Sequence, residues 1–255
     1  MSRTRPRRDV PNRGTVARKR DCSSGVFSAE EIAKRVLYED NHLLALNKPV
    51  GLATMGVSSD EVSLFSLAKE YIKEKYQKPG GVYLGVVSRL DLPVSGVVVF
   101  ARTSKAASRL CEQFGSRSVT KIYRALVEGD LRPDEGELVD YICEDKNARK
   151  LWITESPSVS SRNIDVKEAR LRYKVIERFS STTFVEAHLL TGRKHQIRLQ
   201  FSHCGTPIVG DGKYGAKPIS QMGVCLHAYQ LTIAHPTTKT PLTFLAPVPD
   251  WSRWI

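Results

Sequence analysis

Residues 86–102, VVSRLDLPVSGVVVFAR, form the stretch that decides the fold. They place one acid, Asp91, in a proline-containing loop between an apolar run that ends at Val87 and a second that begins at Gly96. Runs of this length that are rich in Val and Phe and separated by a turn sequence indicate two buried strands. Asp91 is therefore expected in a loop on a rigid frame.

Two interpretations of Asp91 are open from these residues alone. Arg89 is a cation in the same loop, and a carboxylate near cations stays ionised even when it is partly buried. An enzyme can use such a carboxylate as a nucleophile or a base. Alternatively, Asp91 caps the loop, because Asp in turns accepts hydrogen bonds from nearby backbone N–H groups. Without further context, capping is the favoured interpretation.

Apolar periodicity predicts the remaining elements. Helices are expected to begin at Ser28, to cover 62–76, and to start again at Thr103 or Ser104. Strands are expected at 36–39, 42–46, 121–129, 170–179, 183–190, 226–233 and 242–245. Residues 133–161 are polar and predicted to be irregular, with short strands near Leu138 and at 151–153. Strands outnumber helices, which predicts an α+β domain with a mixed, largely antiparallel central sheet and flanking helices.

The charge of the chain is concentrated at its start. The 255 residues have a formal net charge of +12, and residues 1–20 hold eight Lys or Arg against one acid. With few large apolar residues, this segment cannot bury enough surface to become ordered. We therefore expect a disordered basic tail over 1–27 and a single domain over 28–255. The excess of positive charge points to an anionic partner such as nucleic acid or an acidic membrane surface.

The sequence also limits the location of the protein. No stretch approaches the roughly 18 apolar residues of a membrane span, and the tail lacks the apolar core of a secretory signal. A transit peptide is the alternative interpretation of an Arg-rich, acid-poor tail. The five cysteines are widely spaced and odd in number, which is typical of a reducing compartment. We expect a cytoplasmic monomer that does not bind membranes.

Residues 191–198, TGRKHQIR, are a second candidate site. They open a predicted helix whose free N–H groups and cations form an anion site, although a solvated basic helix face explains them equally well. Residues 210–215, GDGKYG, match the pattern of a dinucleotide loop, but Pro218 follows where a helix should run. We interpret them as a glycine turn that presents Asp211 and Tyr214. The histidines and cysteines lack metal-ligand spacing, so we expect no metal and no cofactor.

Taken together, these motifs resemble the RluA-type family of RNA pseudouridine synthases. The matching segments are 47–51 (NKPVG), 89–91 (RLD) with 95–96 (SG), 121–125 (KIYRA), 191–198, 207–211 (PIVGD) with 214–215 (YG), 226–228 (LHA) and 235–237 (HPT). The resemblance spans about residues 36–249 and implies the pseudouridine synthase fold. It reverses the preference for a capping Asp91. It implies catalytic roles for Asp91, Tyr123 and Arg198, and RNA binding by Arg89, Lys121, Arg193 and His195.

Two positions depart from the family pattern. Members usually have His before the Arg-Leu-Asp triplet and Thr before the Ser-Gly pair, where this chain has Ser88 and Val94. Neither supplies the carboxylate, so the departures bear on RNA contacts and substrate choice. Many members also carry a small N-terminal RNA-binding domain, for which the basic tail is a possible substitute.

The implied reaction breaks the N1–C1′ bond of a uridine and joins C5 of the uracil to C1′. It needs no external electrons, energy source or metal, but it needs a carboxylate beside C1′. Asp91 would either attack C1′ or remove a proton from the sugar, and Arg198 would orient it. Ribosomal and transfer RNA are both candidate substrates. The alternative is a non-catalytic RNA-binding or ribosome-assembly protein on the same scaffold, for which the trio Asp91, Tyr123 and Arg198 is not required.

Overall fold

The computed structural model describes residues 27–56, 62–157, 163–217, 219 and 223–252. The prediction of a disordered tail falls on residues 1–26, which lie outside the described residues. Within these described residues the elements follow in the order α1 (Ala29–Ala33), β1 (Val36–Glu39), β2 (Leu43–Lys48), α2 (Leu64–Lys75), β3 (Gly85–Val86), β4 (Ser95–Ala101), α3 (Ser104–Gly115), β5 (Thr120–Glu128), β6 (Glu135–Asp145), β7 (Lys150–Thr154), β8 (Ile164–Arg178), β9 (Thr182–Leu189), α4 (Gln196–His203), the 3₁₀ turn η1 (Gly212–Tyr214), β10 (Leu226–Ala234) and β11 (Pro241–Leu245).

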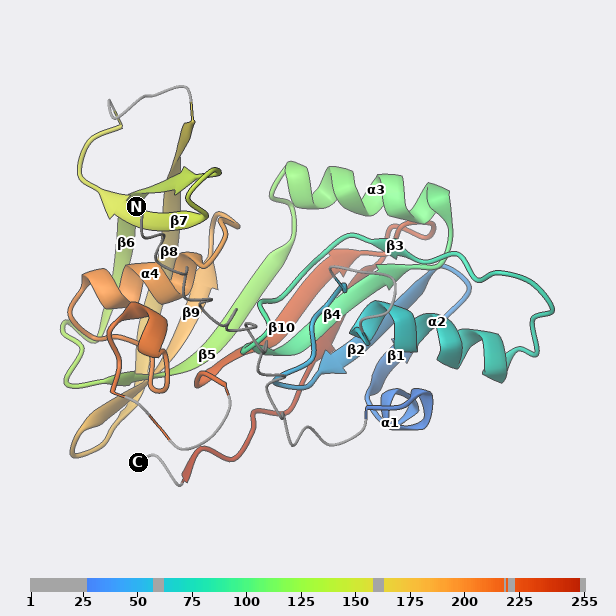
Figure 1. The fold of residues 1–255 in the computed structure, drawn as a ribbon, viewed down its shortest axis with the longest axis horizontal. Helices are drawn as coiled ribbons and strands as arrows, with labels where there is room; N and C mark the ends of the chain where they lie inside the picture. The colour runs from blue at the N-terminus through green and yellow to red at the C-terminus, as the bar shows by residue number, and fades with distance from the viewer. Residues whose placement is uncertain (1–26, 57–61, 158–162, 218, 220–222, 253–255) are drawn as a thin grey trace, which may run out of the picture.

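The strands form one sheet in the order β1-β2-β4-β10-β5-β9-β8-β6-β7 (Figure 1). β3 pairs with β4, and β11 pairs with β10. β10 runs parallel to β4, whereas its pairing with β5 is antiparallel, like the other strand pairs of the sheet. The prediction of a mixed, largely antiparallel sheet with flanking helices is confirmed.

Strand β4 is buried at every position because helices cover both faces of this part of the sheet (Figure 1). Val98 and Phe100 pack with α1 and α2 on one face, whereas Val97 and Val99 pack with α3 on the other. The alternation follows the two-residue period of a strand. It explains why β4 reads as a continuous apolar run rather than as alternating apolar and polar residues.

The helices begin where the sequence places capping residues. The Ser63 hydroxyl accepts a hydrogen bond from the backbone N–H of Ser66 at the start of α2. The Thr103 hydroxyl accepts one from Ala106 at the start of α3, which settles the choice between Thr103 and Ser104. These side chains satisfy N–H groups that have no partner within the helix.

One prediction is wrong. Residues 133–161 were expected to be irregular with short strands near Leu138 and at 151–153; β7 confirms the second strand, but β6 runs without interruption over 11 residues. β8 likewise begins at Ile164, six residues before its predicted start. The two strands pair along their length, from Glu135 opposite Lys174 to Asp145 opposite Ile164. Only two of the 11 positions of β6 are buried, so pairing with a distant segment stabilises the strand without a strong apolar pattern.

The junction of β4 with β10 fixes the end of the Asp91 loop. The Ser95 hydroxyl lies 2.8 Å from Nδ1 of His227, whose Nε2 lies 3.2 Å from the carbonyl oxygen of Ala246. Burial lowers the pKa of His227 to about 4, so its ring is neutral and bonds to both groups. Gly96 has a φ of 115°, and a Cβ at this position would collide with the backbone of Ala228. Glycine therefore permits the close approach of the two strands.

Candidate active site

A buried lysine anchors the loop that carries Asp91. Lys48 at the end of β2 is fully buried. Its ammonium group donates hydrogen bonds to three backbone carbonyls, those of Leu52 at 2.8 Å, Pro49 at 2.9 Å and Leu92 at 3.3 Å. Because Leu92 follows Asp91, this contact ties the loop to β2. Burial lowers the pKa of Lys48 to about 7, and the charge of Asp91 opposes that shift.

Arg198 in α4 joins two carboxylates. One terminal nitrogen of its guanidinium donates to Oδ2 of Asp91 at 3.1 Å. Its Nε and other terminal nitrogen donate to the two oxygens of Asp211 at 2.6 and 2.8 Å. The Arg198 and Asp211 side chains are only 6% and 1% exposed, whereas that of Asp91 is 28% exposed. A bidentate, buried carboxylate thus fixes the guanidinium plane, and the fixed cation holds the more accessible Asp91.

His195 approaches the same oxygen of Asp91 from the start of α4. Its Nε2 lies 3.6 Å from Oδ2, and its Nδ1 lies 2.6 Å from the Tyr214 hydroxyl. Burial, together with the charges of Arg198 and nearby lysines, lowers the pKa of His195, although Asp91 opposes the shift. In the neutral tautomer with its proton on Nε2, the ring accepts a hydrogen bond from the Tyr214 hydroxyl at Nδ1 and directs its N–H towards Asp91. His195 has a φ of 55°, so the chain adopts a left-handed conformation at the residue that contacts the carboxylate.

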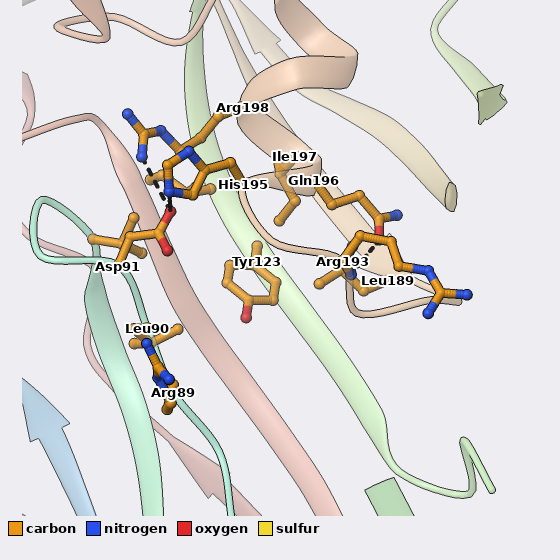
Figure 2. A pocket seen from close by; sticks show the side chains of 12 residues that line it. Arg89, Leu90, Asp91, Tyr123, Leu189, Arg193, His195, Gln196, Ile197 and Arg198 are labelled. Carbon is orange, nitrogen blue, oxygen red and sulfur yellow. Dashed lines mark hydrogen bonds and ion pairs between the residues drawn. The ribbon is translucent and has the colours of Figure 1, made fainter. Parts of the chain in front are cut away.

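The two carboxylate oxygens of Asp91 have different surroundings. Arg198 and His195 both approach Oδ2, whereas the other oxygen is directed towards the side of the cavity where Tyr123 lies (Figure 2). The cavity has a volume of about 80 Å³, and Tyr123 of β5 lies across it from Asp91. Burial and the charge of Asp91 raise the pKa of the Tyr123 hydroxyl above its ordinary value, so the phenol is protonated at neutral pH.

The structure brings the predicted site residues together. Six of the seven line this one cavity: Arg89, Asp91, Tyr123, Arg193, His195 and Arg198. The seventh, Lys121, lines an adjoining cavity. One detail of the sequence analysis is wrong, because exposed Arg89 is not among the described residues that form an ion pair with Asp91. The cation that contacts the carboxylate comes from α4, not from the Asp91 loop itself.

Sequence reasoning did not assign Asp211 and Tyr214 to the site. It placed both on a glycine turn, and the structure confirms a turn there, with the 3₁₀ segment η1 ending in a left-handed Gly215. Their partners, Arg198 and His195, lie in the other motif that the sequence analysis singled out. The sequence offered one signal for this pairing. Asp211 and Tyr214 lie on one turn, and that turn follows the segment that holds His195 and Arg198.

A large hollow opens beside the site. It has a volume of about 470 Å³ and reaches Asp91 from the side of the loop that faces residues 53–55. Arg89, Lys194 and Lys213 contribute positive charge to its wall, together with Arg198. The Asp91 carboxylate is therefore reached through a basic opening that suits an anionic polymer.

Known proteins are similar to this chain. Residues 42–203 match the family described as RNA pseudouridylate synthase. The ribosomal large subunit pseudouridine synthase C of Vibrio vulnificus is 33% identical over 233 residues, which cover 89% of this chain and 69% of that protein. The dual-specificity RNA pseudouridine synthase RluA of Haemophilus influenzae is 34% identical over 215 residues, 83% of this chain and 91% of its own. The chain belongs to the RluA-type family of RNA pseudouridine synthases.

A solved structure of this RNA pseudouridine synthase family has the same fold. Human RNA pseudouridylate synthase domain containing 4 superposes with a TM-score of 0.71 at 25% identity, over 88% of this chain and 92% of the human one. In the present synthase, the two departures from the family pattern serve the fold. The Ser88 hydroxyl accepts a hydrogen bond from the backbone N–H of Val99 at 3.2 Å, and Val94 is buried in the core beside β5.

Proposed function

We propose that this synthase converts uridines of ribosomal RNA to pseudouridine and that Asp91 is the carboxylate that acts on the ribose. One observation carries the proposal: Asp91 and Tyr123 face each other across a small cavity while Arg198 holds one oxygen of the carboxylate. A cation at this distance orients a half-buried carboxylate. The remaining oxygen, which faces the cavity, is the one placed to react with the sugar.

The same oxygen serves either chemical route. If Asp91 attacks C1′, the oxygen forms a bond to that carbon as the uracil N1 leaves. If Asp91 acts as a base, the oxygen takes a proton from the sugar. In both cases the Arg198 guanidinium stays on the other oxygen, which preserves the orientation of the carboxylate throughout the reaction.

Tyr123 is proposed to stack against the uracil. A ring that is parallel to a flipped base holds it without reading its edge. Because the pKa of Tyr123 is raised, its hydroxyl is present as a phenol that donates a hydrogen bond. This weighs against an ionised Tyr123 that removes the C5 proton, and it favours a role in holding and rotating the uracil.

RNA binding is assigned to the cations around the cavity. Arg89, Lys121 and Arg193 are proposed to contact phosphates, with His195 at the cavity wall. The target uridine must leave its stack to reach Asp91, which costs a few kcal/mol. The name of one relative supports large-subunit ribosomal RNA as the substrate. Transfer RNA, the other candidate of the sequence analysis, is the competing substrate.

The test is the substitution Asp91→Asn. It preserves side-chain shape but removes the reacting charge, so tritium release from 5-tritiated uridine RNA should fall at least about a thousandfold. RNA affinity should change little, because phosphate contacts dominate binding. Asp130→Asn is the matched control, since Asp130 is an exposed residue paired with Arg132 and Arg178, away from the Asp91 cavity. Substantial turnover by Asp91→Asn would sink the assignment.

The same assay separates the alternative function. A non-catalytic RNA-binding or assembly protein would bind the RNA and release no tritium in its unaltered form. Mapping pseudouridines in total RNA with and without the enzyme then decides between ribosomal and transfer RNA. A modified position found only in transfer RNA would overturn the proposed substrate but not the reaction.

A further inference from the structure

A second cavity adjoins the Asp91 cavity along β5. It has a volume of about 170 Å³, roughly twice that of its neighbour, and Arg89, Leu90, Tyr123, Leu189 and Arg193 line both. Lys121 belongs to the second cavity alone. Because Lys121 and Tyr123 are two positions apart in one strand, they point to the same face of the sheet about 7 Å apart. The second cavity therefore continues the first along the strand.

Lys121 is a cation without a counter-charge. Burial lowers its pKa, and the two charges that act on it, Arg117 and Arg193, are also positive and lower it further. Among the residues that the structure describes, no hydrogen bond or ion pair is recorded for the Lys121 ammonium. A half-buried cation surrounded by cations is unfavourable until an anion arrives. The arrangement favours a ligand with negative charge.

The loop beside Lys121 leaves room for such a ligand. Gly192 lies next to the Lys121 ammonium, and a Cβ at that position would lie only 3.1 Å from Nζ. Arg193 follows and donates its Nε to the carbonyl oxygen of Glu168 at 2.8 Å, which fixes its guanidinium at the cavity rim. A compact anion at the rim can thus contact the lysine and the arginine together.

The floor of the second cavity is apolar. Val97 of β4 and Leu231 of β10 are buried beneath it, and the Phe114 ring at the end of α3 forms a further wall. Gln230 contributes an amide. Ser88 also lines the cavity, but its hydroxyl is hydrogen-bonded to the backbone of Val99. Its small side chain therefore leaves the cavity open without presenting a free polar group to a ligand. A flat, partly apolar group fits this floor.

We propose that the second cavity binds the nucleotide next to the target uridine. Its backbone phosphate lies on Lys121 and Arg193, and its sugar and base lie over Val97, Leu231 and Phe114. This inference rests on the proposed function, because it takes the ligand of the first cavity to be a uridine. It adds a defined subsite one nucleotide away, with Lys121 as the phosphate contact and Ser88 as the residue that keeps the subsite open.

The test measures whether the charge of Lys121 and the charge of one RNA phosphate depend on each other in binding. Hairpin RNAs containing a uridine that the enzyme modifies are prepared with a single neutral methylphosphonate linkage at each position around it. We expect one linkage adjoining that uridine to weaken binding to the unaltered enzyme about tenfold, the range of one charged contact. The same linkage should weaken the binding of Lys121→Gln clearly less than that of the unaltered enzyme, because only the Arg193 contact to that phosphate remains.

Controls keep the result specific to Lys121. Lys105→Gln removes an exposed charge from α3 and should show the full tenfold effect of that linkage. Lys121→Arg should retain most of the coupling, and equal thermal midpoints exclude a folding defect. Lys121→Gln should also reduce the slope of log affinity against log salt by about 0.7.

Two results would overturn the subsite. One is an equal loss for the unaltered enzyme and Lys121→Gln at every linkage, and the other is no loss at any linkage next to the uridine. Either result can occur while the unaltered enzyme still forms pseudouridine, so the subsite can fail alone. Absence of pseudouridine in every RNA would instead overturn the proposed function.

Discussion

Asp211 and Tyr214 act on the Asp91 carboxylate indirectly, each through one residue of α4. Asp211 fixes Arg198 with two hydrogen bonds, and Tyr214 bonds to His195 at 2.6 Å. Both come from one turn, and both of their partners reach the same oxygen of Asp91. The turn at residues 211–214 is therefore a positioning segment for a carboxylate that it does not contact.

Substituting Asp211 should separate catalysis from RNA binding. Asp211→Asn loses the charge that holds the Arg198 guanidinium, so Arg198 is free to turn away from Asp91 or to pair with it differently. We expect the single-turnover rate to fall about tenfold to a hundredfold, because oriented charges contribute on this scale. The Kd for RNA should stay nearly constant.

A purely structural role for Asp211 would give a different result. Destabilisation lowers the amount of folded enzyme and affects rate and binding together, whereas misorientation of Arg198 affects the rate alone. Active-site titration with bound RNA corrects for the folded fraction. A normal single-turnover rate after that correction would remove Asp211 from the positioning segment.

The sequence could indicate the members of the site but not all their contacts. Asp91 and Arg198 are 107 residues apart, and their pairing was expected only through resemblance to a family. Asp211 and Arg198 are separated by 13 residues across a helix end and a loop, and no local pattern reports the pairing. Arg89 was expected near Asp91 because it is close in sequence, yet neighbours in a loop often point to opposite sides.

At the scale of elements, the β4–β10 junction makes stability sensitive to acid. The neutral His227 ring bridges Ser95 and Ala246, and its pKa of about 4 lies below the ordinary value of 6.5. As pH falls below 6.5, His227 becomes protonated in the unfolded chain but stays neutral in the folded chain. The contribution of His227 is therefore complete above pH 6.5 and is lost between pH 6.5 and 4.

This loss can be measured by denaturant unfolding. Between pH 7.5 and 4.5 the His227 contribution to the free energy of unfolding should fall by about 2 to 3 kcal/mol. Because other groups titrate in the same range, the quantity to compare is the pH dependence of the unaltered protein minus that of His227→Gln. Parallel pH curves for the two proteins would show that His227 does not carry the effect.

The elements differ in how clearly the sequence predicts them. β4 is buried on both faces, so its apolar run is unmistakable. β6 carries exposed acids such as Glu135 and Glu137 and is stabilised by pairing with β8 over 11 residues. A single-sequence pattern reports burial, not pairing, and it therefore misses strands that lie at a solvated end of a sheet.

At the scale of the whole molecule, positive charge is divided between the domain and the tail. Residues 1–20 hold eight of the 39 Lys and Arg residues. Deleting them should weaken binding to all RNAs alike and flatten the dependence of log affinity on log salt. Each lost phosphate contact should change the slope by about 0.7 to 0.9.

The set of modified uridines should not change on deletion, because phosphate contacts position the protein while the cavity reads the flipped base. The comparison requires full-length and truncated enzyme at several salt concentrations, followed by pseudouridine mapping. An unchanged slope would show that the tail does not contact RNA. A changed set of sites would show that it reads sequence or shape.

The order of the strands in the sheet could not be predicted from the sequence. It affects how the sheet assembles as the chain is synthesised. β10, close to the end of the chain, lies between β4 and β5 and so joins the part of the sheet that carries Asp91 to the part that carries Tyr123. A nascent chain emerges from the ribosome starting with its N-terminus. The β4 and β5 parts of the sheet therefore emerge before β10, the strand that joins them. A chain that ends before Leu226 therefore contains all of the proposed site residues but lacks the strand that joins the two parts of the sheet. We therefore expect pseudouridine formation only from chains that include β10.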